Sequence, residues 1–169
     1  MLGFLFESLG YCVEPEKLAF KKKEARLYKG VLLISKYAAV YGFFLGVAVV
    51  LSFFFLVDFI SLPFPFSGLL GILSFVAIPL ITVSFIVVSV VLSLVVSGLI
   101  HLIAMIFGGH GSFEEFFYLN SLLYPSLSVI TFALFCIPFL ASVITFLWYL
   151  YVLYLYFRIV QIVHKIWLV

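Results

Sequence analysis

Residues 101–125 have the sequence HLIAMIFGGHGSFEEFFYLNSLLYP, and this stretch decides how the chain is organised. It joins two long apolar segments through a short polar turn that is rich in glycine. Glycine accepts the left-handed backbone conformation in which many helices end, so Gly108 and Gly109 are suited to ending one helix. Ser112 and Glu115 have the S-x-x-E spacing of a capping box at the start of the next helix. We therefore predict an inter-span turn formed by Gly108, Gly109, His110, Gly111, Ser112 and Glu115.

The composition of the 169-residue chain lies outside the range of soluble globular proteins. The chain is 67% hydrophobic and only 9% charged, and its mean hydropathy is +1.40. A soluble domain carries about 25% charged residues, which cover its surface, so lipid must be the solvent for most of this chain. We predict an all-α fold, a polytopic bundle of transmembrane helices. The formal net charge of +2 is too small to indicate a nucleic acid partner.

The two cysteines do not indicate a disulfide framework. Cys12 lies in an amphipathic segment and Cys136 lies in the middle of an apolar run. We interpret both as small buried hydrophobic residues, with acylation of Cys12 as the alternative.

Residues 1–30 are predicted to form amphipathic and basic helices at the cytoplasmic membrane surface, because seven of the nine basic residues lie in the first 36 positions. The first helix would lie in the interface, and a second would run from Pro15 to Tyr28. Lys22, Arg26 and Lys29 would share one face and hold anionic lipid headgroups or an acidic partner. Alternatively, these cations only fix the topology under the positive-inside rule. Both interpretations place the amino terminus in the cytoplasm.

Residues 31–169 are predicted to form the transmembrane bundle, with about four spans. We place the spans near residues 33–57, 75–107, 116–136 and 139–158. The apolar run from residue 66 to residue 107 would be about 63 Å long as a helix, more than one perpendicular crossing needs. It is either one long tilted helix or a hairpin that turns near Pro79 to Ser84. We favour one crossing, because it returns Arg158 and Lys165 to the side of the amino-terminal lysines.

A row of small polar residues spaced by four runs along the second predicted span and ends in a histidine: Ser89, Ser93, Ser97 and His101. Small residues at this spacing let helices pack closely. An ionisable residue within a span also suggests a polar pathway, which is the alternative. Gly42 and Gly46 form a GxxxG pair for close packing, and Asn120 and Tyr124 fall near one face of the third span. We predict that these residues form a packing or polar seam.

The residues around the turn include candidate metal ligands. His110 and Glu114 are four residues apart, with Glu115 and His101 as further candidates, but nothing in the spacing fixes a full ligand set. We therefore expect neither a metal nor a cofactor. No nucleophile, base and orienting group occur together, and Asp58 should lie at the opposite membrane face from the two glutamates, so we expect no enzyme activity.

The central stretch resembles the prokaryotic-type branch of the Yip family, the Ypt/Rab-interacting multi-span membrane proteins. The motif is HLIAMIFGGHGSF, with His110 where lysine or arginine is more usual. A family-like Tyr124-Pro125 follows, then the aromatic span LWYLYVLYLYFR, and a helix containing Pro15 precedes the first span. The resemblance implies a bundle of about five spans with a cytoplasmic amino terminus. In eukaryotic members it also implies a role in vesicle trafficking through small GTPases and membrane shape.

The chain departs from that family in two ways. It lacks the long cytoplasmic amino-terminal region of the eukaryotic trafficking members, which makes binding of a small GTPase doubtful. It stops at Val169, where the family usually continues through another span. We expect either a shortened protein or a last helix that a neighbouring subunit supplies.

We therefore expect a non-enzymatic integral membrane scaffold or adaptor of Yip type, acting in membrane organisation or a trafficking-like process. Its partners would be the lipid bilayer and either copies of itself or other membrane proteins. It would be a multi-pass protein, in the cell membrane if the source is prokaryotic. The alternative is a small transporter or channel with a polar path along Ser89, Ser93, Ser97, His101 and Asn120.

Overall fold

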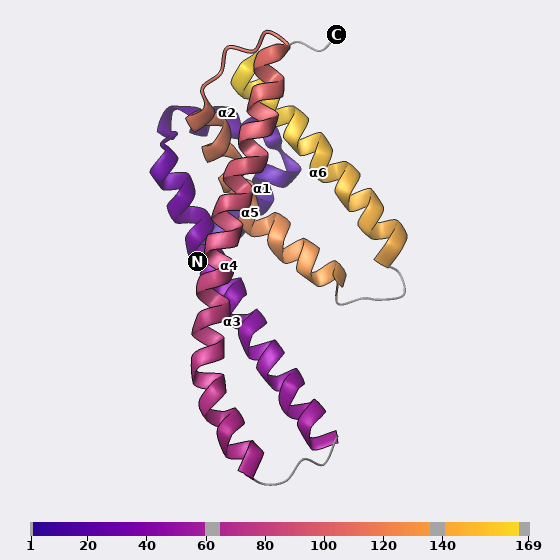
Figure 1. The fold of residues 1–169 in the computed structure, drawn as a ribbon. Helices are drawn as coiled ribbons and strands as arrows, with labels where there is room; N and C mark the ends of the chain where they lie inside the picture. Colours follow the sequence, from indigo (N-terminus) through magenta and orange to yellow (C-terminus); the bar gives the residue numbers. More distant parts are fainter. Residues whose placement is uncertain (1, 60–64, 136–140, 166–169) are drawn as a thin grey trace. The chain divides into compact units, whose positions relative to one another are not determined.

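The structure is a computed structural model that describes residues 2–59, 65–135 and 141–165 (Figure 1). Within these ranges every regular element is a helix. The elements are α1 (Leu2–Val13), η1 (Pro15–Lys17), α2 (Leu18–Lys21), η2 (Lys22–Glu24), α3 (Leu27–Phe59), α4 (Pro65–Ile106), α5 (Phe113–Phe135) and α6 (Ala141–His164). The η elements are short 3-10 helices.

Three of the described helices are long and apolar enough to cross a membrane. These segments are Leu27–Phe55, Phe75–Ile106 and Val143–His164. They agree with the prediction of an all-α membrane protein. Helix α4 runs without interruption from Pro65 to Ile106, so residues 79–84 lie inside it and the hairpin interpretation is wrong. Apolar helices tolerate an internal proline because neighbouring groups can satisfy the freed backbone atoms.

The chain divides into two compact units, which are described separately. Unit 1 comprises residues 1–34 and 92–169, and unit 2 comprises residues 35–91. In unit 2, α3 packs against α4 through the predicted GxxxG pair. A β-carbon at Gly42 would lie 3.0 Å from the Cα of Thr82, and one at Gly46 would lie 3.3 Å from the Cα of Ile78. The two glycines therefore serve packing within one chain, because only they let the backbones come this close.

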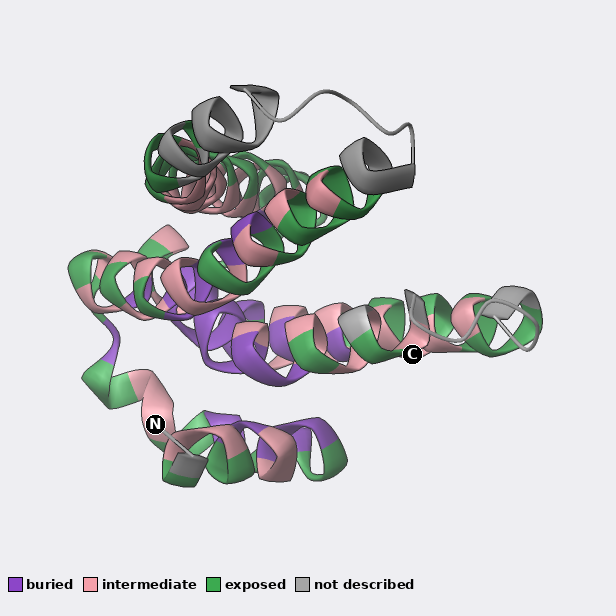
Figure 2. Cartoon of the chain, turned by 90° about the horizontal axis from the view of Figure 1, so that it is seen from below, coloured by how far each residue is buried: buried purple, intermediate pink, exposed green. Residues whose placement is uncertain are grey.

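Helix α5 forms the centre of unit 1, with α1 and α6 packed against it. Residues at the start of α5 are almost completely buried, among them Phe116, Phe117, Leu119 and Leu123. Figure 2 shows the buried residues in purple where helices adjoin. Burying large apolar side chains of this kind stabilises a fold by about 1.5–3 kcal/mol each in water, and by less where lipid is the solvent.

The amino-terminal segment differs from the prediction. A single helix from Pro15 to Tyr28 is wrong, because the chain forms three short helical pieces and then turns at Ala25, whose backbone is extended with φ −60° and ψ 127°. Leu18 and Ala25 are buried in the core of unit 1. With both side chains buried, the turn at Ala25 leads the chain into the start of α3. A continuous helix from Pro15 to Tyr28 would have no such turn.

Helix α1 docks on α5 through a serine. The buried Ser8 Oγ donates a hydrogen bond to the Leu122 carbonyl at 2.7 Å and accepts one from the Ser126 amide at 3.4 Å. Leu122 and Ser126 are four residues apart, so they are the positions that pair in a regular helix. Pro125 lies between them, and it donates no amide to the helix. The serine hydroxyl therefore bonds to the backbone of α5 where a proline interrupts its hydrogen bonding.

The face of α1 that carries Ser8 also carries Cys12, which is buried. Burial raises the pKa of the Cys12 thiol to about 11, and Tyr151 donates a hydrogen bond to the Cys12 carbonyl. A buried, protonated thiol is a poor acceptor for an acyl group, so the packing interpretation of Cys12 is the better one. The opposite face of α1 is exposed at Phe6 and Val13, as in a helix at a membrane interface.

Candidate functional site

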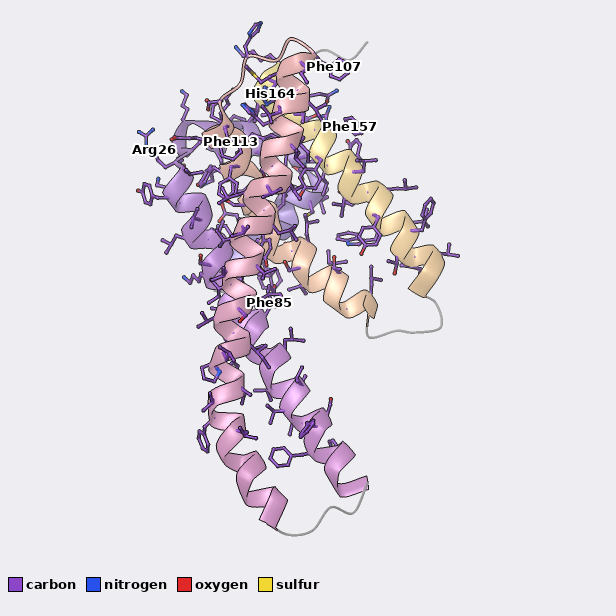
Figure 3. All side chains as sticks on the ribbon, in the orientation of Figure 1. Arg26, Phe85, Phe107, Phe113, Phe157 and His164 are labelled. Carbon is purple, nitrogen blue, oxygen red and sulfur yellow. The ribbon has the colours of Figure 1, made fainter. Side chains whose placement is uncertain are left out.

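The candidate site lies at one end of unit 1, where α4 ends, α5 begins and α6 ends. His101 comes from the last two turns of α4, and His164 is the last residue of α6. Figure 3 shows His164 at the same end as Phe107 and Phe113, which flank the turn between α4 and α5. The His164 side chain is almost fully buried, since only 1% of the residue is exposed.

The two histidine rings are hydrogen-bonded to each other. His101 Nδ1 lies 3.2 Å from His164 Nε2, and the Gly111 amide donates to His164 Nδ1 at 3.1 Å. A backbone amide can only donate, so His164 Nδ1 carries no proton and the proton of the neutral ring sits on Nε2. Nε2 then donates to His101 Nδ1. The turn amide thus fixes the tautomer of both rings.

The glycines of the turn allow α6 to approach it. Gly108 has φ +84°, a conformation that other residues rarely adopt. A β-carbon at Gly109 would lie 2.8 Å from His164 Nδ1, and one at Gly111 would lie 2.6 Å from the Val163 carbonyl oxygen. Glycine in this turn was predicted to end a helix. A second reason for glycine is the close contact of Gly109 and Gly111 with α6, which is distant in the sequence.

The start of α5 carries the predicted capping box. The Glu115 amide donates to Ser112 Oγ at 3.3 Å, and the Ser112 amide is 3.5 Å from Glu115 Oε2. The same carboxylate oxygen lies 3.1 Å from the Lys22 ammonium, which also donates to the Val163 carbonyl at 3.1 Å. Lys22 therefore ties η2 to both α5 and α6.

The three cations predicted to hold a lipid headgroup or an acidic partner do not act as one set. Lys22 is bonded within the site, as described. Arg26 is exposed, and the Lys29 ammonium is 3.4 Å from the Glu24 carbonyl. Of the three, Arg26 and Lys29 are therefore the side chains that are not bonded to a carboxylate within the site and could contact a lipid headgroup or an acidic partner. The difference arises because η2 ends at Glu24 and breaks the helical face that the prediction assumed.

Part of the predicted seam is present in unit 1. Asn120 Nδ2 donates to Ser97 Oγ at 3.0 Å, and both residues are buried. Ser97 lies one turn before His101 on α4, so the histidine pair and this bond follow each other along one helix face. Ser93 and Tyr124 are half-buried. Ser89 belongs to unit 2, as do Gly42 and Gly46.

The arrangement also bears on metal binding. Among the residues that the structure describes, no three histidine, cysteine, aspartate or glutamate side chains gather as they would around a metal ion. His110 is exposed. A metal ligand nitrogen must be unprotonated, and His164 Nε2 carries the proton because Nδ1 accepts from Gly111. The histidine pair is therefore a hydrogen-bonded contact between helices.

Neither His164 nor the role of Lys22 was predicted from the sequence. The last span was predicted to end near residue 158, whereas α6 continues to His164. A signal was available: Leu155, Ile159 and Val163 continue at a spacing of four, and all three are buried. That spacing carries the helix on to its final residue, His164.

An apolar groove lies beside the histidine pair, between α4 and α6. Its volume is about 420 Å³, and its lining residues are all hydrophobic or aromatic. The lining includes Ile103 and Phe107 of α4 and Leu153 and Phe157 of α6. Both helices contain segments apolar enough to cross a membrane, so lipid or another apolar helix is the expected neighbour of this groove.

The chain was compared with protein-family models, curated proteins and solved structures, and none of the three comparisons found a match.

Proposed function

We propose that the chain is a non-enzymatic integral membrane scaffold or adaptor of Yip type, which associates with copies of itself or with other membrane proteins. In this proposal α5 is a fourth span beside the three apolar helices, and the amino terminus is cytoplasmic. The observation that carries the proposal is that the polar groups of the candidate site bond to one another.

The buried ring of His164 bonds to His101 and to a turn amide, and the Lys22 ammonium bonds to Glu115. These contacts hold the ends of α4, α5 and α6 in one arrangement. A fully bonded polar network makes a structure rigid and unique, which is what a scaffold needs. The lateral face of the same unit is apolar and includes the groove between α4 and α6. Such a face suits packing against other membrane helices.

The test is association in a bilayer. Copies labelled with donor or acceptor fluorophores are reconstituted together, and energy transfer is followed as lipid is added. Specific association keeps the transfer above the value for random mixing after tenfold dilution. In parallel, a photoreactive amino acid replaces Phe157 in the groove, and the control carries it at Val143, an exposed position of α6 outside the groove. Discrete cross-linked products from Phe157 alone support the proposal. Random mixing together with no discrete product contradicts it.

A transporter or channel is the second candidate, and one observation favours it. The Ser97–Asn120 bond lies one helical turn from His101, so buried polar groups follow each other along α4. Proton or solute flux through reconstituted vesicles tests this candidate. Flux that disappears in Asn120→Leu supports it, and a vesicle preparation without flux counts against it.

A further inference from the structure

We propose that the His101–His164 pair is an acid-released latch, which holds the turn of residues 108–112 against the end of α6 and opens when the pair takes up one proton. The inference does not rest on the scaffold proposal, because it concerns only the bonds at the end of unit 1. It assigns a regulatory role to a group that the proposed function uses only for rigidity.

The bonds of the pair run in one direction. The Gly111 amide donates to His164 Nδ1, and His164 Nε2 donates to His101 Nδ1. A proton added at His101 Nδ1 would face the Nε2 proton of His164. Alternatively, His164 could transfer its Nε2 proton to His101 Nδ1. The added proton would then have to bind His164 Nδ1, where it would face the Gly111 amide proton. In either case two donors oppose each other at a contact of about 3 Å, and one bond of the chain must break.

Charged and titratable side chains from η2, α5 and the turn lie around the histidine pair. Lys22 from η2 and Glu115 from α5 both act on His164 from nearby. Lys22 and Glu115 lie 3.1 Å apart and form an ion pair with each other. His110 in the turn and Lys165 after α6 are exposed, where solvent screens them.

Opening of the latch would also affect backbone contacts between the turn and α6. The His110 amide faces the His164 carbonyl at 3.5 Å, so the turn touches α6 through its backbone as well. A β-carbon at Gly111 would lie 2.6 Å from the Val163 carbonyl oxygen, so the turn and α6 are closely packed at this point. When the added proton sits on His164 Nδ1, the Gly111–His164 bond is the one that breaks, and its loss releases the turn, with the start of α5, from the end of α6.

The test is amide hydrogen exchange at Gly111, measured on the full chain in lipid nanodiscs from pH 7.5 to pH 4.5 and corrected for the intrinsic exchange rate. We expect constant protection near neutral pH and a loss of roughly tenfold in acid, the scale of one lost hydrogen bond. In His164→Asn the Asn Oδ1 takes the place of Nδ1 and still accepts from Gly111, but it does not titrate. Protection in this variant should not depend on pH. The control is His110→Ala, which removes an exposed histidine from the same turn and should keep the full response.

A second measurement needs no variant. Nitrogen NMR of ¹⁵N-histidine protein distinguishes bare from protonated ring nitrogens, and at pH 7.5 the rings of His101 and His164 must both show a bare Nδ1 and a protonated Nε2. In acid both nitrogens of one ring must become protonated as Gly111 protection falls. Protection at Gly111 that is independent of pH in the wild type overturns the proposal. A response that persists in His164→Asn, or a protonated Nδ1 on His164 at pH 7.5, overturns it as well.

Discussion

Replacing Gly111 with alanine should separate the turn from α6. The new β-carbon would lie 2.6 Å from the Val163 carbonyl oxygen and 2.8 Å from the Val163 carbonyl carbon. These are backbone atoms, so they cannot rotate away as a side chain could. Overpacking of this kind costs about 1–3 kcal/mol, and the displaced Gly111 amide would lose its bond to His164, worth about 0.5–1.5 kcal/mol. We expect the free energy of unfolding to fall by about 1.5–4.5 kcal/mol.

The assay is reversible unfolding of the purified protein in mixed micelles by titration with SDS, followed by circular dichroism. The matched control is Gly98→Ala in α4, where an added β-carbon has no neighbour within 4 Å. This control should leave stability unchanged or raise it by up to about 1 kcal/mol, because alanine is favoured over glycine inside a helix. If Gly111→Ala and Gly98→Ala unfold at the same SDS fraction, the close contact between the turn and α6 is refuted.

Three further predictions concern other contacts of unit 1. Ser8→Ala should destabilise the protein by about 1–3 kcal/mol, because it leaves buried backbone groups of α5 without the serine hydroxyl. Ser52→Ala, which removes an exposed hydroxyl bonded within its own helix, is the comparison in the same SDS titration and should have little effect. Asn120→Leu should cost about 0.6 kcal/mol and at most about 1.7 kcal/mol, the range measured for hydrogen bonds between membrane helices. A larger loss of unfolding free energy in the same SDS titration would mean that the Asn120 side chain contributes more to stability than its hydrogen bond to Ser97 of α4. Burial raises the pKa of Cys12 from 9.0 to about 11, so its contribution to stability is complete below pH 9 and is lost as the pH rises from 9 to 11. At pH 8, maleimide should therefore label Cys12, followed separately from Cys136, about 100-fold more slowly in the folded protein than in the SDS-unfolded protein, and equal rates would contradict the burial.

The parts of the fold that follow from local chemistry could be predicted from the sequence. Gly108 and the Ser112–Glu115 pair act on their own backbone neighbours, so the turn and the start of α5 could be derived from spacing alone. The all-α membrane class follows from composition. One crossing in residues 66–107 was favoured because it returns Arg158 and Lys165 to the side of the amino-terminal lysines, and α4 is uninterrupted over Pro65–Ile106.

Contacts between distant residues could not be predicted in this way. Gly111 must be glycine because of Val163, which lies 52 positions later, and nothing near Gly111 in the sequence marks that contact. Lys22 looked like one member of a surface basic cluster, and only the fold shows that Glu115 accepts it. Trp148 lies in the aromatic span LWYLYVLYLYFR, and nothing near it in the sequence marks its partner. Its indole nitrogen donates to Thr131 Oγ1 at 3.0 Å, joining α6 to α5.

The bond between Ser8 and Leu122 has a consequence for how the protein is made. The two residues are 114 positions apart in the chain. At about 5–20 residues per second, a ribosome needs about 6–23 seconds to reach the second residue after the first. For that time the nascent α1 has no α5 on which to dock, and its face bearing Tyr11 and Cys12 must rest on the membrane surface or on a chaperone. Helix α1 is therefore synthesised first but docks late, because its partner α5, which carries Pro125, must first be translated and folded.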